Sequence, residues 1–247
     1  MLSDRRNRYR IGVLVPYTNT NLEPDMGLMC PHGMSIHTTR IAGYDSDVVP
    51  GLDQMKQMGT ASVSEALKLL KPIKPDAMLY GCTSATLSLG WTADLDFASQ
   101  LGAMAGCPAI TTSGAIIEAL RQLDAKKIML VTPYDTELTN AGAAFLQSAG
   151  FNILSVNHPR EDLNSREQGA MKPEQIIALC KSGNHLTVDA IVMTCTDLRA
   201  LECIDEVEKL TGKRVVTSNQ ALFWCALRVL GIPTTSVPGR LGSLAAT

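Results

Sequence analysis

Two cysteines, each followed by threonine, are the residues of this sequence best suited to covalent or acid–base chemistry. Cys82 lies in the segment Gly-Cys-Thr-Ser at 81–84, and Cys195 lies in the segment Thr-Cys-Thr-Asp at 194–197. A thiolate attacks electron-poor carbon, and a thiol can exchange a proton with a carbon next to a carboxylate. We therefore predict that these two side chains are catalytic and face each other across a small carboxylate-binding cleft.

Both cysteines follow a short apolar run and precede residues that favour the start of a helix. At such a position the positive end of the helix dipole and the unpaired N–H groups favour a thiolate and can hold a carboxylate. We therefore expect a lowered pKa at both thiols. The hydroxyls of Thr83, Ser84 and Thr196 are adjacent candidates for substrate contacts. The other five cysteines lie beside proline or inside apolar helical patterns, and we interpret them as packing residues.

The elements that must position these turns are short apolar strands that alternate with helical segments. Each strand ends in Gly, Pro, Ser or Thr and is followed by a segment with helical periodicity, which is typical of parallel sheets covered by helices on both faces. The predicted strands are at 10–15, 34–39, 76–80, 109–112, 127–132, 152–157, 189–193 and 214–217.

The second four strands resemble the first four in sequence, which indicates an internal duplication. Three anchors occur in the same order with slowly decreasing shifts of 117, 113 and 105 residues: 11–17 with 128–134, 76–83 with 189–196, and 109–113 with 215–218. The predicted fold is α/β, with two pseudo-symmetric three-layer domains that each contain a mainly four-stranded parallel sheet. We expect residues 1–115 with 220–247 to form the N-terminal half, residues 116–219 to form the C-terminal half, and the active site to lie in the cleft between them.

The loop after the first strand of each half supplies a neutral hydrogen-bond donor. Asn19 follows the first strand, and Tyr134 follows the corresponding strand of the second half. In open α/β sheets ligands bind beyond the carboxyl ends of the strands. Both side chains can donate to carboxylate oxygens without adding a charge, but residues of this kind after proline are also common in ordinary turns, so the residues alone leave both interpretations open.

Composition and missing motifs exclude several classes of function. The chain has 247 residues, of which 45% are hydrophobic and 19% charged, and its formal net charge of -2 disfavours nucleic acid as a partner. The apolar run at 11–15 is too short for a signal peptide or a membrane span, and seven cysteines without metal-ligand spacing are typical of a reducing cytoplasm. The four histidines are scattered, and neither phosphate-binding glycine motifs nor a GxSxG elbow occur, so we expect no metal, no nucleotide cofactor and no serine-hydrolase chemistry.

The sequence resembles the aspartate/glutamate racemase superfamily, and within it the branch of maleate cis-trans isomerase and arylmalonate decarboxylase. The resemblance covers nearly the whole chain. It is carried by segment 10–16 with Asn19, Thr20 and Glu23, by Gly81-Cys82, by segments 113–115 and 131–134, by Cys195, and by segments 210–213 and 237–242.

The resemblance implies an enzyme without a cofactor that holds its substrate between two thiols, and it implies a homo-oligomer. In a maleate isomerase one thiolate adds to the alkene, the central bond of the succinyl intermediate rotates, and the second cysteine assists before fumarate leaves. In the racemases one cysteine removes the α-proton and the other returns a proton from the opposite face. On this sequence Cys82 matches the nucleophile and Cys195 its partner, Asn19 and Tyr134 match the carboxylate contacts, and Asn164 matches a further contact.

The sequence departs from the isomerase motifs in ways that leave decarboxylation as a second possible reaction. The pair Thr83-Ser84 occurs in the decarboxylase, where it helps to stabilise an enediolate, but the decarboxylase has glycine at the position of Cys82. The leading hypothesis is therefore an isomerase or racemase of a small carboxylic acid that uses both thiols. The alternative is a malonate-type decarboxylase that needs only Cys195, and a third reading is a non-catalytic anion-binding protein. We expect specificity to be set by segments 40–56 and 157–169.

Overall fold

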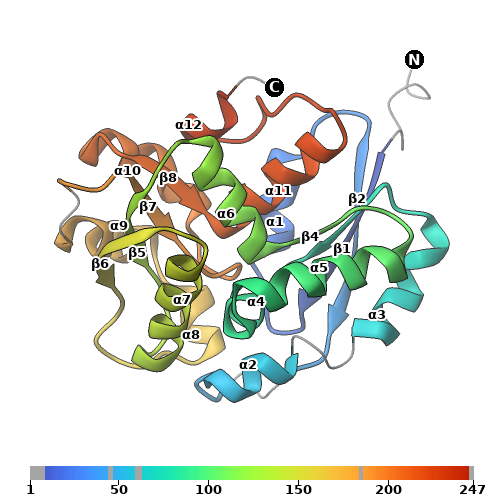
Figure 1. Cartoon of the computed structure of the whole chain (residues 1–247), viewed down its shortest axis with the longest axis horizontal. Coiled ribbons are helices and arrows are strands. Elements are labelled where there is room, and N and C mark those ends of the chain that lie inside the picture. The colour runs from blue at the N-terminus through green and yellow to red at the C-terminus, as the bar shows by residue number, and fades with distance from the viewer. Residues whose placement is uncertain (1–8, 44–46, 59–62, 184–185, 245–247) are drawn as a thin grey trace.

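The computed structural model describes residues 9–43, 47–58, 63–183 and 186–244, and it contains two parallel sheets of four strands each (Figure 1). The first sheet has the strand order β2-β1-β3-β4 and the second has the order β6-β5-β7-β8. All eight predicted strands are confirmed, with ends that shift by at most two residues. They are β1 (Tyr9–Pro16), β2 (Met34–Ile41), β3 (Ala77–Tyr80), β4 (Ala109–Thr111), β5 (Lys127–Val131), β6 (Asn152–Asn157), β7 (Ala190–Met193) and β8 (Arg214–Thr217).

Helices connect successive strands and cover the sheets (Figure 1). The first half contains α1 (Leu22–Met29), α2 (Leu52–Met58), α3 (Val63–Leu70), the 3-10 turn η2 (Lys71–Ile73), α4 (Thr83–Leu89), α5 (Trp91–Ala105) and α6 (Thr112–Gln122). The rest of the chain contains α7 (Thr136–Ser148), α8 (Ser165–Ala170), α9 (Pro173–Ser182), the 3-10 turn η3 (Leu201–Cys203), α10 (Ile204–Thr211), α11 (Ser218–Val229) and α12 (Gly239–Gly242).

The two sheets correspond strand by strand, as the sequence repeat predicts. In the first sheet Ile11 of β1 lies opposite Ala77 of β3, and in the second Ile128 of β5 lies opposite Ala190 of β7. These pairs reproduce the shifts of 117 and 113 residues. The third sequence anchor was one residue out of register, because the helices that follow β4 and β8 begin at Thr112 and at Ser218, so Ser218 corresponds to Thr112 rather than to Ser113.

The inner strands are buried on both faces because their sequences are continuous apolar runs. All four residues of β3 and all four of β7 are buried. An apolar run of this kind suits a parallel strand that is covered on both sides, whereas the edge strand β6 alternates between exposed and half-buried positions. The turns that follow β3 and β7 therefore start from deep inside the molecule.

Helix α11 joins the two halves. It follows β8 of the second sheet, yet it packs mainly against α6 and also contacts β3 and β4 of the first sheet (Figure 1). Its residues from Ser218 to Leu227 are all buried, including the large side chain of Trp224. The predicted division into residues 1–115 with 220–247 and residues 116–219 stays a prediction.

None of the helices in the described part of the chain is long and apolar enough to cross a membrane.

Candidate active site

The two cysteine turns lie at the carboxyl ends of equivalent strands but differ in local structure. Cys82 follows β3 and is the N-cap residue of α4, which begins at Thr83 as predicted. Cys195 follows β7, but no helix starts there; the chain turns and passes through η3 before α10 begins at Ile204. The prediction of a helix start beside Asp197 was wrong. The Cys195 backbone has a φ of 104°, a left-handed conformation that residues with a side chain rarely adopt.

One buried pocket brings the two thiols together. Its cavity volume is about 30 Å³, room for about one water molecule, so the side chains around it have to move apart to admit a larger ligand. Cys82 and Cys195 are 3% and 8% exposed, respectively. The pocket is lined by Pro16, Thr18, Asn19, Met58, Cys82, Ser84, Ser165, Gln168, Cys195, Thr196 and Asp197.

Burial makes both cysteines neutral thiols at physiological pH. Loss of hydration raises the pKa of Cys82 to about 11, although its sulfur accepts hydrogen bonds from Ser84 and from the N–H groups at the start of α4. Loss of hydration and the nearby charge of Asp197 raise the pKa of Cys195 to about 12, and hydrogen bonding to Tyr134 acts in the opposite direction. The expected lowering of both pKa values was therefore wrong: at Cys82 the helix start offsets only part of the cost of a buried thiolate, and at Cys195 no helix starts.

Asn19 and Thr196 link the two halves beside the thiols. The Asn19 amide donates to the Thr196 hydroxyl at 3.0 Å, and that hydroxyl donates to the carbonyl of Gly81 at 3.0 Å. The Asn19 side-chain oxygen accepts the N–H group of Leu22 at 2.9 Å, which caps α1. Both predicted contacts thus lie in the pocket with fixed orientations.

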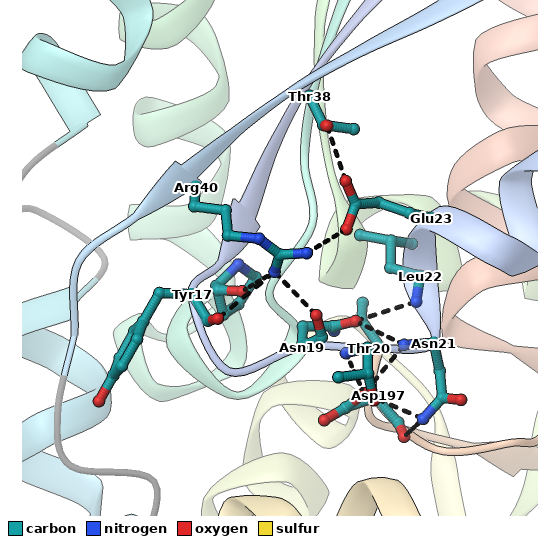
Figure 2. Close-up of polar contacts among 11 residues, drawn as sticks. Tyr17, Asn19, Thr20, Asn21, Leu22, Glu23, Thr38, Arg40 and Asp197 are labelled. Atoms are coloured by element: carbon teal, nitrogen blue, oxygen red, sulfur yellow. Dashed lines mark hydrogen bonds and ion pairs between the residues drawn. The ribbon is translucent and has the colours of Figure 1, made fainter.

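Asp197 ties the Cys195 turn to the loop after β1 (Figure 2). Its Oδ1 accepts the N–H groups of Thr20 at 2.8 Å and Asn21 at 3.1 Å, and its backbone carbonyl accepts the Asn21 side-chain amide at 2.6 Å. Burial raises the pKa of this carboxyl, and the N–H and side-chain donors of Thr20 and Asn21 counteract part of that rise. Asp197 therefore connects the turn after β7 in the second half to the loop after β1 in the first half.

The remaining predicted residues lie in different places. Ser84 lines the pocket, and its hydroxyl is 3.5 Å from the Cys82 sulfur. Tyr134 is buried, and its interaction with the Cys195 thiol lowers the pKa of that thiol. Thr83 is also buried, but its hydroxyl points to Ser218 at 2.8 Å. Asn164 is the N-cap residue of α8, and its side-chain oxygen accepts the N–H group of Glu167 at 3.0 Å.

Helix α8 contributes two pocket residues that no sequence motif indicated. Ser165 and Gln168 both line the pocket, and the side-chain oxygen of Gln168 lies 4.0 Å from the Cys195 sulfur. Both fall inside segment 157–169, which was predicted to set specificity. In the other predicted segment, 40–56, residues 44–46 lie outside the described part of the chain.

No group of three or more His, Cys, Asp and Glu side chains could hold a metal ion, as far as the described residues extend. The five other cysteines are free thiols, and Cys180, Cys203 and Cys225 among them are buried.

The family model described as arylmalonate decarboxylase matches residues 11–241, which is most of the chain. The chain belongs to this family. A maleate isomerase of Nocardia farcinica is 32% identical over 242 residues, which cover 93% of each protein. The prediction that the chain belongs to the branch of maleate isomerase and arylmalonate decarboxylase is therefore confirmed.

Solved structures of family members share this fold. The N. farcinica maleate cis-trans isomerase bound to TRIS matches with a TM-score of 0.87 at 28% identity, covering 95% of this chain and 97% of that one. A variant of that isomerase, in which serine replaces a cysteine, contains a covalently bound succinylcysteine intermediate; it matches with a TM-score of 0.81 at 27% identity and covers 95% and 98% of the two chains. These relatives confirm the predicted enzyme class, an isomerase that works through cysteine.

Proposed function

We propose that this protein interconverts the cis and trans isomers of a small unsaturated dicarboxylic acid, with maleate as the first candidate, and that Cys82 and Cys195 carry out the reaction. The observation that supports this most strongly is that both thiols border the same pocket. The maleate isomerases among the relatives support the choice of substrate, and the succinylcysteine in one of them supports a covalent route.

In the proposed reaction the Cys82 sulfur bonds to one alkene carbon as the π bond breaks, and the neighbouring carbon takes the proton of the Cys195 thiol. The proton that leaves Cys82 passes to the Cys195 sulfur. The bond between the two carbons is now single and rotates. The neighbouring carbon then gives a proton to the Cys195 sulfur as the carbon–sulfur bond breaks, and the proton already on Cys195 passes to the Cys82 sulfur, which gives the trans acid and restores both thiols. Because the thiols rest in the neutral state, removal of the Cys82 proton has to accompany the attack.

The polar residues of the pocket receive supporting roles in this proposal. An amide carries two hydrogens, so Asn19 can donate one to Thr196 and the other to a substrate carboxylate. We assign further substrate contacts to Ser84, Tyr134 and Thr196. Thr83 and Asn164 hold local structure instead, because their side chains bond to Ser218 and to the start of α8.

Proton NMR in D2O with maleate, aspartate, glutamate, malate and phenylmalonate tests this function. Formation of fumarate from maleate is the expected result. Deuterium at an α-carbon without isomerisation would instead indicate a racemase, and conversion of phenylmalonate to deuterated phenylacetate would indicate the decarboxylase. Turnover of none of these acids would contradict the proposal.

Serine substitutions separate two-thiol chemistry from decarboxylation. Cys82→Ser and Cys195→Ser should each remove most of the isomerase activity, while Cys107→Ser should keep it because Cys107 is half-buried after α5 and does not line the pocket. If Cys82→Ser still decarboxylates phenylmalonate at the full rate and Cys195→Ser does not, the decarboxylase is favoured.

Three further features belong to this proposal. We assign the active site to a cleft between an N-terminal half, 1–115 with 220–247, and a C-terminal half, 116–219. We also propose that the protein works as a homo-oligomer, and that it acts in the cytoplasm, where its thiols stay reduced.

A further inference from the structure

The backbone of the loop that carries Asn19 accepts hydrogen bonds from the guanidinium group of Arg40 (Figure 2). Arg40, near the end of β2, directs its Nη1 to the carbonyl oxygens of Asn19, Pro16 and Tyr17 at 2.8, 3.2 and 3.4 Å. Arg40 is not among the residues that line the thiol pocket. It therefore contacts the backbone of the loop that carries Asn19 without bordering the pocket.

Arg40 is itself oriented by a carboxylate. Its Nη2 forms an ion pair with Glu23 of α1, and the other Glu23 oxygen accepts the Thr38 hydroxyl at 2.7 Å (Figure 2). In a planar guanidinium one nitrogen can bind the loop carbonyls while the other binds the Glu23 carboxylate, which the single ammonium nitrogen of a lysine does less well. The contacts thus depend on arginine in particular.

The peptide bond between Asn19 and Thr20 lies between two opposite charges. Its carbonyl oxygen accepts a hydrogen bond from Arg40 at 2.8 Å, and its N–H group donates to Asp197 at 2.8 Å. In a trans peptide these two groups point in opposite directions, so the peptide dipole is aligned favourably with the cation on one side and the anion on the other. This arrangement fixes the backbone of Asn19 relative to the turn that carries Cys195.

We propose that Arg40 is a positioning residue that acts on the substrate through Asn19, an inference that rests on the proposed function of the pocket. The guanidinium and the Asp197 carboxylate hold the Asn19 peptide between them, and the Asn19 amide is thereby aimed at the carboxylate of the bound acid. Without the guanidinium, three backbone carbonyl groups lose their donor, and the Asn19 amide takes up a wider range of positions. Binding of the acid weakens, while the thiols and their chemistry stay in place.

A double-mutant cycle of Arg40→Met and Asn19→Ala measures this dependence. Arg40→Met alone should raise the KM for maleate by about tenfold, the effect of losing one modest polar contact, with a smaller change in kcat. Asn19→Ala should raise KM at least as much. In the Asn19→Ala background Arg40→Met should add little, because Arg40 acts through the amide that is already gone.

Two matched variants separate positioning from general stability. Arg10→Met removes another arginine of the first sheet that also donates to a carbonyl, that of Ile73 at 2.8 Å, but at the opposite end of β1. It should lower Tm about as much as Arg40→Met and leave KM unchanged. Arg40→Lys should restore part of the affinity, because an ammonium group reaches fewer of the carbonyls.

Calorimetric titration of the same proteins with malonate gives a Kd that does not depend on turnover. If the wild type converts none of the acids but binds malonate with the predicted pattern of Kd values, the proposed reaction is wrong and the role of Arg40 stands. The role of Arg40 would be overturned, even in an active isomerase, if Arg40→Met had the KM and Kd of the wild type. It would also be overturned if the KM increase in the double variant were the product of the increases in the two single variants. A wild type that neither converts nor binds these acids would overturn both.

Discussion

The side chains of Thr83 and Ser218 hydrogen bond to each other at 2.8 Å although they lie 135 residues apart in the sequence. The same Ser218 oxygen accepts the N–H group of Cys195 at 3.0 Å. Since Thr83 directly follows Cys82, one buried hydroxyl at the start of α11 connects the two cysteine turns. A side chain that belongs to neither turn therefore helps to set the separation of the thiols, beside the direct bond from Thr196 to Gly81.

Replacement of this hydroxyl should destabilise the protein. Ser218→Ala leaves the buried N–H group of Cys195 without its acceptor, which should lower the free energy of unfolding by about 1–3 kcal/mol. Urea unfolding followed by circular dichroism measures this change. The matched variant is Ser148→Ala, where an exposed hydroxyl donates to the carbonyl of Phe145 at the end of α7, and it should cost about 0.5 kcal/mol or less. Equal decreases in the free energy of unfolding of the two variants would show that the bond from Cys195 to Ser218 contributes no more than an exposed hydrogen bond.

The left-handed backbone at Cys195 predicts an unusual preference for glycine. Because a φ of 104° strains any residue with a Cβ, Cys195→Gly should be more stable than Cys195→Ala by roughly 1 kcal/mol. At Cys225, which is buried inside α11, the order should reverse, since glycine in a helix costs about 0.5–1 kcal/mol relative to alanine. Thermal unfolding of the four variants decides the point. A more stable alanine variant at both positions would mean that the turn relaxes to a negative φ.

The fold and the pair of thiols were predictable because they depend on local patterns. Each strand is a short apolar run that ends at a turn residue, and a thiol followed by threonine occurs after equivalent strands of both halves. A helix start after Cys82 was also predicted, although the hydroxyls that suggested it do not cap α4: its N-cap residue is Cys82, and the Thr83 hydroxyl bonds to Ser218. None of these features requires knowledge of distant contacts.

The missed features depend on residues far apart in the chain. Gln168 comes to within 4.0 Å of the Cys195 sulfur across 27 positions, and no motif marks it. The raised thiol pKa values come from burial, which depends on how the two halves close over the pocket rather than on the turns themselves. The turn after Cys195 is fixed by the bonds of Asp197 to the loop after β1, and without that partner its sequence looked like a helix start.

The buried thiols should respond to pH unlike ordinary cysteines. With pKa values raised to about 11 at Cys82 and about 12 at Cys195, the thiolate fraction grows about tenfold per pH unit and has not levelled off at pH 9.5. Alkylation by iodoacetamide should therefore keep accelerating from pH 7 to 9.5 at both sites, whereas glutathione, with an ordinary thiol pKa near 8.5, should level off. Mass spectrometry of the alkylated peptides gives each rate. A plateau below pH 9 at either cysteine would contradict the raised pKa.

Asp94 should make the protein less stable as the pH rises through neutrality. Burial raises the pKa of this carboxyl to about 7, and its Oδ1 has no hydrogen-bond partner among the described residues, while its Oδ2 accepts the Thr111 hydroxyl at 2.9 Å. Because the folded state holds this proton more tightly than the unfolded state, whose pKa is about 3.9, the stabilisation is complete below pH 4 and is lost as the pH rises through about 7.

Asp94→Asn removes this titration and keeps an oxygen that can accept from Thr111. The free energy of unfolding of Asp94→Asn minus that of the wild type should therefore increase between pH 4 and pH 8, as measured by urea unfolding at several pH values. Asp96→Asn changes an exposed carboxyl on the same helix and should give a difference that hardly varies with pH. If the difference for Asp94→Asn is also constant, the buried carboxyl ionises as easily in the folded protein as in the unfolded chain. Its Oδ1 would then need a hydrogen-bond donor such as an ordered water.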